Sequence, residues 1–283
     1  MGTVRCKSYA KINLTLKITG EENGFHNLDS VVASVDLYDL IVLKKRRDKL
    51  VSITMHGQGS ESIPFESNNA VRAAENFVEE FDTCGADITV YKNIPMGLGL
   101  GGSSADAAGV LNGLCKLYKI NDPIKIKLLA DRAGSDTRYM LGGGYARLFG
   151  RGNVVKQIES NLRLDILLLA PSCQVSTAEC YKRFNAPYEA DGNGAEQAVE
   201  SGDKFALAKH ICNDLTAPAT TLCGEVQTAV DELKEFDPLA VNMTGSGSGV
   251  YAIFENAEFC AYAKSRYRGK FRAIQLKTII PQI

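Results

Sequence analysis

The sequence lacks several features that define common classes of protein. Its 283 residues include no tryptophan and only three histidines, and no stretch of apolar residues approaches the length of a transmembrane helix. The first residues also lack the apolar core of a signal peptide. These absences predict a cytoplasmic protein without a membrane partner.

Cysteine is not scarce, but its arrangement argues against the usual reasons for having it. The eight cysteines form no CxxC pair, and three histidines are too few to complete a zinc site around them. We therefore expect no structural metal, and we expect most of the cysteines to be reduced thiols that serve as small core residues.

An excess of charge of either sign is also missing. The chain has 32 Lys and Arg against 33 Asp and Glu, for a formal net charge of -1. No long run of Lys or Arg occurs, whereas a protein that binds nucleic acid would usually show a basic stripe. We expect a small-molecule substrate and no nucleic-acid partner.

A chain of this length forms either one large domain or two. Strands and helices mix without the strict alternation of a doubly wound sheet, which predicts an α+β fold. The almost continuous apolar run 162–170 indicates a buried strand that opens a second domain. We place the boundary near residue 155, which gives domains 1–155 and 156–283.

Periodicity predicts the individual elements. In the first strand, apolar residues alternate with Lys11 and Asn13, so these two side chains share a face that points to solvent or to a site. The expected strands are 10–18, 31–43, 87–91, a short strand between 144 and 150, 162–170, 250–254 and 271–279. The expected helices are 71–78, 103–118, 124–133, 195–213 with a break, 225–236 and 256–267, and 186–194 is expected to be an exposed loop.

The segment 95–108, PMGLGLGGSSADAA, carries the strongest local signal. Four glycines within six positions let the backbone approach a bulky anion with several N–H groups pointing one way. Ser103 and Ser104 then open a helix whose positive end suits a phosphate chain. No Gly-Lys-Ser or Gly-Lys-Thr follows, so this is not a Walker loop, and no ribose-binding acid supports a dinucleotide fingerprint. A loop that merely caps a helix is the remaining alternative.

Three motifs, in the expected order, resemble those of the GHMP kinases, the superfamily of galactokinase, homoserine kinase and mevalonate kinase. The segment 10–14 resembles their first motif, 95–108 their second and the glycine/serine segment 243–249 their third. The resemblance implies a two-domain α+β fold, with an N-terminal ATP-binding domain related in fold to a ribosomal protein and a ferredoxin-like C-terminal substrate domain. It also implies an ATP-dependent small-molecule kinase.

Three further segments resemble one branch of that superfamily, the kinases of the non-mevalonate route to isoprenoids. These segments are 24–28, 133–136 and 175–181. The resemblance implies that the substrate is the cytidine diphosphate derivative of methylerythritol and that its 2-hydroxyl attacks the γ-phosphate of ATP. Asp136 would accept or orient the hydroxyl proton, and Lys11 would offset charge beside it. On local sequence alone, Lys11 would be a solvated strand lysine and Asp136 a turn or capping residue.

The same resemblance implies the binding residues. Phe25 and Tyr181 would sandwich the cytosine, His26 would bind its edge, and Asn13 and Thr177 would contact the erythritol or its phosphates. Magnesium is expected with ATP; no protein ligand is assigned, and the candidates are two serines of the ATP set. That set comprises Asn69, Pro95, Met96, Gly97, Leu98, Gly99, Leu100, Gly101, Gly102, Ser103, Ser104 and Ala105.

The sequence departs from this branch at two places. Phe25 stands where a tyrosine is usual, and Thr137-Arg138-Tyr139-Met140 replaces an apolar stretch, which puts the charge of Arg138 near the predicted site. Another GHMP kinase, acting on mevalonate, homoserine or a sugar, is one alternative. A catalytically silent nucleotide-binding regulator is another, although it would be expected to lack Lys11 or Asp136. The sequence leaves open whether the protein is a monomer or a homodimer.

Overall fold

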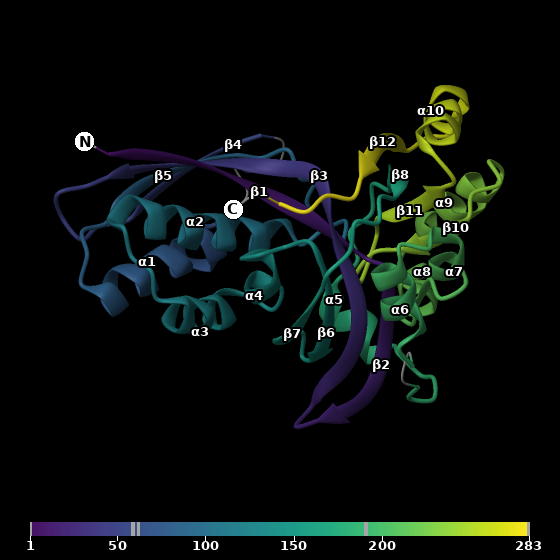
Figure 1. Cartoon of the computed structure of the whole chain (residues 1–283), viewed down its shortest axis with the longest axis horizontal. Coiled ribbons are helices and arrows are strands. Elements are labelled where there is room, and N and C mark those ends of the chain that lie inside the picture. The colour runs from purple at the N-terminus through teal and green to yellow at the C-terminus, as the bar shows by residue number, and fades with distance from the viewer. Residues whose placement is uncertain (1, 58–59, 61–62, 190–191, 282–283) are drawn as a thin grey trace.

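Two β-sheets with helices packed on them make up the protein (Figure 1). A computed structural model describes residues 2–57, 60, 63–189 and 192–281. Within these residues, the N-terminal half forms most of an eight-stranded sheet, and the C-terminal half forms a four-stranded sheet in the order β10-β11-β8-β12. The two sheets meet around the central region where the predicted site residues lie.

The larger sheet is organised around β3, a strand of 21 residues that pairs antiparallel with β1, β2, β5 and β6. The hairpin of β2 and β3 extends away from the body of the molecule at the lower edge of Figure 1. Strands of this sheet are β1 Thr3–Asn13, β2 Thr15–Glu22, β3 Phe25–Lys45, β4 Ser52–His56, β5 Ala86–Tyr91, β6 Tyr145–Gly150, β7 Val154–Ile158 and β9 Cys212–Asn213.

Helices of the N-terminal half cover one face of this sheet. The small residues of α2 let it pack closely: a side chain at Gly113 would collide with Leu43 of β3, and one at Gly109 would lie too close to Ile41. Helices α1 and α3 then pack against α2. The helices of this half are α1 Asn69–Phe81, α2 Gly102–Tyr118, α3 Pro123–Ala133 and α4 Thr137–Met140, with a short 3-10 turn at Phe65–Ser67.

The apolar run around β8 is explained by burial on both sides of the smaller sheet. Ile166 and Leu168 face a core shared with β1 and β3, whereas Leu167 and Leu169 face a second core under helices of the C-terminal half. The elements of this half are β8 Asp165–Ala170, β10 Ala240–Met243, β11 Val250–Phe254, β12 Arg272–Lys277, α5 Thr177–Lys182, α6 Gly194–Ser201, α7 Lys204–Ala208, α8 Thr216–Leu222, α9 Glu225–Lys234 and α10 Ala257–Arg266.

Several predicted elements need correction. The single strand expected at 10–18 is two strands, because the chain bends at Leu14 and both parts pair with β3. The helix expected at 195–213 is α6, α7 and the short strand β9. Strands β4, β7 and β10 and helices α4, α5 and α8 were not predicted. The loop expected at 186–194 is partly seen, but its residues 190–191 lie outside the described part of the chain.

Most of the cysteines were expected to be reduced, and one pair is an exception. Cys173, just after β8, is disulfide-bonded to Cys223, between α8 and α9. The two residues are 50 positions apart, so only the folding of the smaller sheet brings them together. Within the part of the chain that the structure describes, the other six cysteines form no disulfide.

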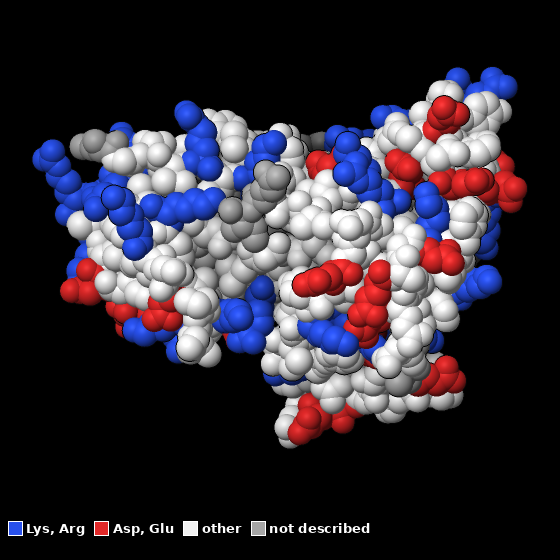
Figure 2. Space-filling view, viewed as in Figure 1, with Lys and Arg blue, Asp and Glu red and all other residues white. Residues whose placement is uncertain are grey.

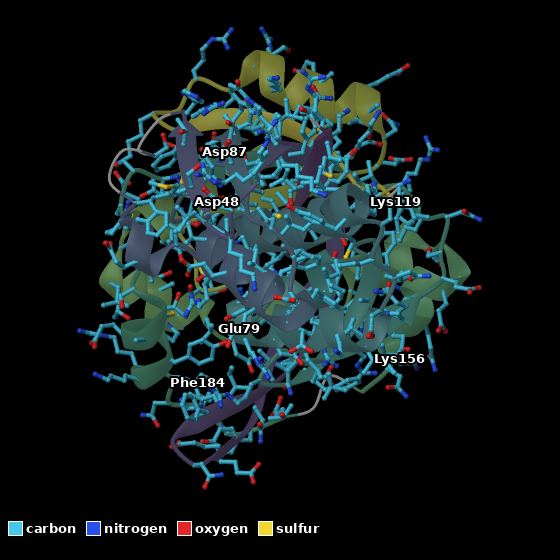
Figure 3. The ribbon with its side chains drawn as sticks, turned by 90° about the vertical axis from the view of Figure 1, so that its left-hand side faces the viewer. Asp48, Glu79, Asp87, Lys119, Lys156 and Phe184 are labelled. Atoms are coloured by element: carbon cyan, nitrogen blue, oxygen red, sulfur yellow. A yellow bond between two sulfur atoms is a disulfide. The ribbon has the colours of Figure 1, made fainter. Side chains whose placement is uncertain are left out.

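Charged side chains of both signs are distributed over the surface. Figure 2 shows Lys and Arg gathered over the end of the molecule where β1 begins, and mixed acidic and basic residues over the C-terminal half. At this same end of the sheet, just after β3, Arg46 binds both Asp48 and Asp87, which lie near each other in Figure 3. These are partly exposed ion pairs that contribute little to stability.

Candidate active site

The glycine-rich loop, residues 95–105, runs from the end of β5 to the first turn of α2. Gly99 and Gly101 both have φ of 72°, a backbone conformation that other residues rarely adopt. A side chain at Gly99 would collide with the carbonyl oxygen of Thr244, and one at Gly101 would collide with Met140 and crowd Lys11. Glycine is therefore required at both positions for the loop to touch its neighbours.

Lys11 lies directly beside this loop and is buried. Its backbone N–H donates to Leu100 O at 3.0 Å, and its ammonium lies 3.4 Å from Asp136 Oδ2. Asp136 stands at the start of α4, but its side chain makes no capping hydrogen bond. Its carboxylate, about a quarter exposed, is thus left to face Lys11 and the solvent.

Asn13 connects Lys11 to the second glycine/serine loop, residues 243–249. Its Oδ1 accepts from Lys11 Nζ at 2.5 Å and from the N–H of Gly245 at 2.9 Å. Its Nδ2 donates to Ser30 Oγ at 2.8 Å, and Thr244 Oγ1 reaches the carbonyl oxygen of Gly99 at 3.2 Å. Because the polar atoms of the Asn13 side chain are engaged within the protein, its geometry suits it to positioning the ammonium of Lys11.

A cavity of about 290 Å³ is lined by the glycine-rich loop. Its other walls include Met55 and Ile63, which are apolar, and Asn68, which caps the N-terminus of α1. The loop contributes every residue from Pro95 to Ser104, so backbone N–H groups and the N-terminus of α2 border this space. Such a cavity can hold a nucleotide phosphate chain beside an apolar wall.

A second cavity, of about 590 Å³, lies at Asp136. Ser104 lines both cavities, so the loop cavity and the Asp136 cavity adjoin at the first turn of α2. Asn69 also lines the second cavity rather than the first, and Arg151 reaches it from the turn after β6. A group bound along the loop could therefore approach a hydroxyl held next to Asp136.

The predicted cytidine residues lie on β3 and α5. His26 and Tyr181 stack on each other with ring centroids 5.4 Å apart, and Phe184 packs edge-on to His26. Phe184 lies beside the β2–β3 hairpin in Figure 3. Burial raises the pKa of Tyr181, and the carboxylate of Asp136 raises it further, so this ring lies within electrostatic reach of Asp136.

Phe25 and Thr177 have different surroundings. Phe25 is half exposed, and the guanidinium of Arg151 lies over its ring at 3.5 Å. The two rings expected to sandwich cytosine each have another partner: Phe25 contacts Arg151, and Tyr181 contacts His26. Thr177 Oγ1 is 2.8 Å from Ser246 Oγ of the second glycine/serine loop.

Arg138 does not bring an unpaired charge to the site. Its guanidinium makes a bidentate ion pair with Asp131, with distances of 2.7 and 2.5 Å. Asp131 lines the Asp136 cavity, whereas Arg138 lines a separate cavity on the other side of α4. The positive charge that Arg138 introduces is thus neutralised by Asp131.

Several residues at the site were not predicted from the sequence. Asn68 rather than Asn69 borders the loop cavity, and the pair Asn68-Asn69 gave no local signal to choose between them. Thr244 and Arg151 join the site through contacts with segments far away in the chain. Among the residues the structure describes, no helix is long and apolar enough to cross a membrane.

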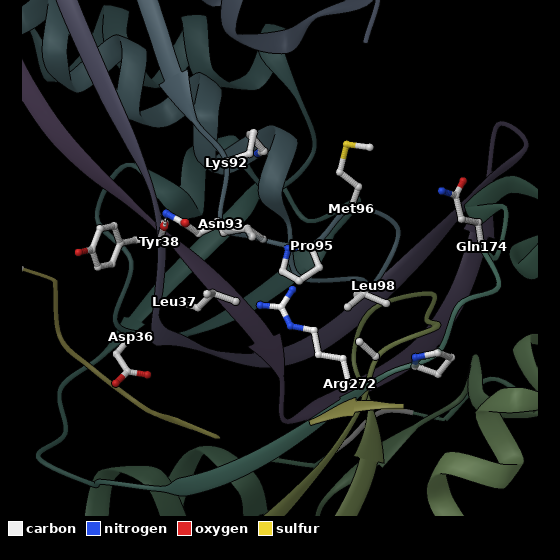
Figure 4. Close-up of a pocket in the computed structure, with 13 residues that line it drawn as sticks. Asp36, Leu37, Tyr38, Lys92, Asn93, Pro95, Met96, Leu98, Gln174 and Arg272 are labelled. Atoms are coloured by element: carbon white, nitrogen blue, oxygen red, sulfur yellow. Dashed lines mark hydrogen bonds between the residues drawn. The ribbon is translucent and has the colours of Figure 1, made fainter. Parts of the chain in front are cut away.

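A larger cleft, of about 800 Å³, lies at the start of the glycine-rich loop, across the loop from the 290 Å³ cavity (Figure 4). Pro95, Met96 and Leu98 of the glycine-rich loop form one wall, and Arg272 of β12 faces them. Asn93 in this wall donates to the carbonyl oxygen of Tyr38 at 3.1 Å. The glycine-rich loop is thus a partition between two open spaces.

Family models agree with this geometry. The model "GHMP kinases N terminal domain" matches residues 68–146, and "GHMP kinases C terminal" matches residues 195–265, together more than half of the chain. The fold and site define a GHMP kinase, an ATP-dependent phosphotransferase of two domains. The predicted α+β fold class and the predicted kinase activity are confirmed.

Comparison with individual relatives identifies the branch of the GHMP kinases to which the chain belongs. The chain is 32% identical to "4-diphosphocytidyl-2-C-methyl-D-erythritol kinase" of Caldanaerobacter subterraneus subsp. tengcongensis, covering 98% of this chain and 97% of the relative. A crystal structure of 4-(cytidine 5'-diphospho)-2C-methyl-D-erythritol kinase matches with a TM-score of 0.80 and 25% identity, over 97% and 99% of the two chains. Homoserine kinase from Cytophaga hutchinsonii, at 14% identity, a TM-score of 0.73 and coverage of 96% and 95%, shares the fold. The chain belongs to the family of 4-diphosphocytidyl-2-C-methyl-D-erythritol kinases.

Proposed function

We propose that the chain transfers the γ-phosphate of ATP to the 2-hydroxyl of 4-diphosphocytidyl-2-C-methyl-D-erythritol, in the non-mevalonate route to isoprenoid precursors. One observation carries this proposal. Ser104 lines both the glycine-rich loop cavity and the cavity of Asp136, and the Lys11–Asp136 ion pair lies beside them. Donor and acceptor would therefore meet where a positive charge and a proton acceptor are already in place.

The donor side consists of the loop and the start of α2. Backbone N–H groups of the loop and the positive end of α2 would hold the β- and γ-phosphates. The ammonium of Lys11 would then face the oxygens of the transferring phosphoryl group and offset the charge that develops there. Asn13 keeps that ammonium in position through its 2.5 Å hydrogen bond.

The acceptor side depends on Asp136. As the bond forms between the substrate 2-oxygen and the γ-phosphorus, the bond from that phosphorus to the β-phosphate bridging oxygen breaks and ADP leaves. The proton of the 2-hydroxyl passes to the carboxylate of Asp136. The free, partly exposed side chain of Asp136 supports this role, because a capping aspartate would have its oxygens occupied.

The cytidine end of the substrate would lie at the stacked rings. We propose that the cytosine stacks on Tyr181, that His26 binds the edge of the base, and that Phe25 covers the other side with Arg151. The buried Nδ1 of His26 has no hydrogen-bond partner among the described residues, which leaves it available to a base. Since His26 and Tyr181 already touch, the rings would separate slightly when the base enters.

Magnesium would enter with ATP and neutralise phosphate charge. GHMP kinases in general use ATP with magnesium, and the groups around Ser104 are oxygen donors of the kind that magnesium prefers. Ser103 and Ser104 line the loop cavity and are the residues that would hold the ion. Because the reaction consumes ATP, we propose a cytoplasmic enzyme.

A substrate comparison tests the function. Purified protein would be offered ATP with the cytidyl substrate, mevalonate or homoserine, and ADP release would be followed in a coupled assay. We expect turnover only with the cytidyl substrate. Phosphorylation of mevalonate or homoserine instead would assign the chain another acceptor. ATP binding without turnover on any acceptor would favour a regulator.

A further inference from the structure

A buried cluster of charges lies at the root of the β2–β3 hairpin. The guanidinium of Arg147 on β6 makes a bidentate ion pair with Asp29 on β3, with distances of 2.7 and 2.5 Å. Its remaining nitrogen, Nη1, donates to Glu196 Oε2 of α6 at 2.9 Å and to Asn193 Oδ1. The side chains of Arg147, Asp29 and Glu196 are exposed by 6% or less. One guanidinium therefore joins two strands of the larger sheet to a helix of the C-terminal half.

The register of the sheet explains why the guanidinium reaches Asp29. Arg147 is directly opposite Val31 of β3, and Asp29 is the next residue along that strand on the same face. Lys156, opposite Arg147 on β7, lies 2.5 Å from the other carboxylate oxygen of Glu196. Each of the two carboxylates thus has a cation, and the charges of the cluster balance.

Burial of this cluster needs an explanation beyond stability. Removing ionised groups from water is costly, and apolar side chains of similar volume often stabilise a fold as well or better. What the charged arrangement adds is direction, because a planar guanidinium bound by two parallel hydrogen bonds fixes the angle as well as the distance between its partners. The cluster is therefore suited to hold one segment of the chain at a defined orientation to another.

The segment held in this way is the hairpin that extends from the body of the molecule in Figure 1. Asp29 is paired across the hairpin with Lys17 of β2, whose ammonium lies 3.2 Å from Asp214 Oδ1. Both strands are thus tied to the C-terminal half at the same level, β3 through the guanidinium and β2 through Asp214. Beyond this level lie residues 19–27, which include His26.

The orientation of the hairpin sets the space at the proposed cytidine end. His26 belongs to the hairpin, whereas Tyr181 and Phe184, which pack on it, belong to the C-terminal half. Arg147 fixes β3 against α6 of that same half. A rotation of the hairpin about its root would therefore change the space between His26 and Tyr181, where the base is proposed to bind.

We propose that Arg147 is a positioning residue for the acceptor, which holds the β2–β3 hairpin at the orientation in which His26 and Tyr181 receive the cytosine. This proposal rests on the proposed function, which places the cytidine at these rings. Arg147 lines neither the loop cavity nor the Asp136 cavity, so it acts through the hairpin. Its loss is expected to weaken binding of the acceptor and to leave binding of ATP unchanged.

A double variant separates positioning from stability. Replacing Arg147 alone would leave the carboxylate of Asp29 buried and unpaired, which can prevent folding. When Arg147→Met is combined with Asp29→Asn, Glu196 keeps its ion pair with Lys156, so neither change leaves a buried charge without a partner. We expect the KM for the cytidyl substrate to rise about tenfold, the effect of losing one charge-assisted hydrogen bond, with the KM for ATP within about twofold of wild type.

Two single variants accompany the double variant. Arg147→Lys keeps the charge but loses the planar fork, so its KM for the cytidyl substrate should lie between those of the wild type and the double variant. Arg46→Met is the matched control, because Arg46 also binds two carboxylates but lies just after the far end of β3. Both of its KM values should equal those of the wild type.

Hydrogen exchange gives a readout that does not require turnover. In the double variant, the backbone amides of residues 19–27 should exchange faster than in the wild type, because the orientation of the hairpin is no longer fixed. An unchanged KM for the cytidyl substrate, or equal rises in both KM values with a lower Tm, would mean that Arg147 only supports the fold and would overturn the proposal. If no acceptor is phosphorylated, the proposed function fails instead. The exchange rates then still decide whether Arg147 holds the hairpin, since unchanged rates would show that it does not.

Discussion

At the scale of single residues, Asp136 is distinguished by what its side chain does not do. It begins a helix without capping it, and its carboxylate faces the buried ammonium of Lys11 at 3.4 Å. Asp131, five residues earlier, is by contrast fully engaged with Arg138. A carboxylate that is held close to a cation but left accessible is suited to accept a proton.

Replacing Asp136 should therefore remove catalysis and spare binding. Asp136→Ala is expected to lower kcat by about 10²–10⁴-fold, because the hydroxyl loses its proton acceptor, with the KM for ATP nearly unchanged. Steady-state kinetics of the two substrates measure both. Asp131→Asn, in the same cavity, is the matched control and should keep most activity. A near-normal kcat in Asp136→Ala would exclude the base assignment.

Tyr181 offers a second test at this scale. Tyr181→Ala should raise the KM for the cytidyl substrate about tenfold or more, because stacking on a base contributes about 1–3 kcal/mol. The KM for ATP should change little, because Tyr181 lines neither the loop cavity nor the Asp136 cavity. Equal effects on the two KM values would contradict the stacking model.

Residues of the site could be predicted from the sequence where they belong to a motif. Lys11, Asp136 and the loop each lie in a local pattern that can be compared with a family. Asn68, Asp29 and Arg147 do not, because their importance comes from contacts between segments that only the fold brings together. The roles assigned to individual site residues stay predictions.

At the scale of elements, the glycine-rich loop is shaped by contact with its neighbours. Gly99 has a positive φ and touches the backbone of Thr244, which ties the loop to the second glycine/serine loop. This contact joins the N-terminal half to the C-terminal half at the site. The loop is therefore a packed element with a defined conformation.

Substitution of Gly99 should disturb both binding and stability. Gly99→Ala is expected to cost about 1–2 kcal/mol for the left-handed backbone alone, and more for the collision with Thr244. We expect a higher KM for ATP and a lower free energy of unfolding in urea. Gly224→Ala is the control, because Gly224 has φ of -59° and open space around it. An unchanged KM for ATP and an unchanged free energy of unfolding in Gly99→Ala would show that the loop can change its conformation to accept a side chain.

Elements with a long regular pattern were predicted well and short ones were not. Helix α2 and strand β8 carry continuous signals, and both were found within a few residues. Helices α5 and α8 have seven residues or fewer, too short to show periodicity. The bend at Leu14 was missed because the alternation of apolar and polar residues continues through it.

At the scale of the whole molecule, the disulfide ties together distant parts of the C-terminal half. The carbonyl oxygen of Cys173 accepts from Ser248 Oγ at 2.7 Å, so the bonded segment also contacts the second glycine/serine loop. Cys223 lies 50 positions further along the chain. A cross-link across a loop of this length stabilises mainly by restricting the unfolded chain.

Reduction of this bond should lower the stability of the fold. A loop of this length corresponds to about 4 kcal/mol, or a fall of about 10 °C in Tm. Differential scanning calorimetry with and without reductant measures it, and thiol titration should count six thiols in the oxidised protein. Cys173→Ser should melt like reduced wild type, and Cys84→Ser like oxidised wild type. Eight titratable thiols in untreated protein would show that the bond does not form.

The length of β3 has a consequence for how the two substrates meet. Strand β3 carries His26 at the proposed cytidine end, Ser30 beneath Asn13, and Asp39 at the base of the glycine-rich loop. Because β3 pairs with β1 on both sides of a register shift opposite Tyr9–Lys11, the folded strand fixes the spacing between these residues. Deleting one residue between Ser30 and Asp39 would leave each half of the site chemically complete but displaced and facing the wrong side of the sheet. The distance between the proposed acceptor and donor sites is thus set by the folded strand before either substrate binds.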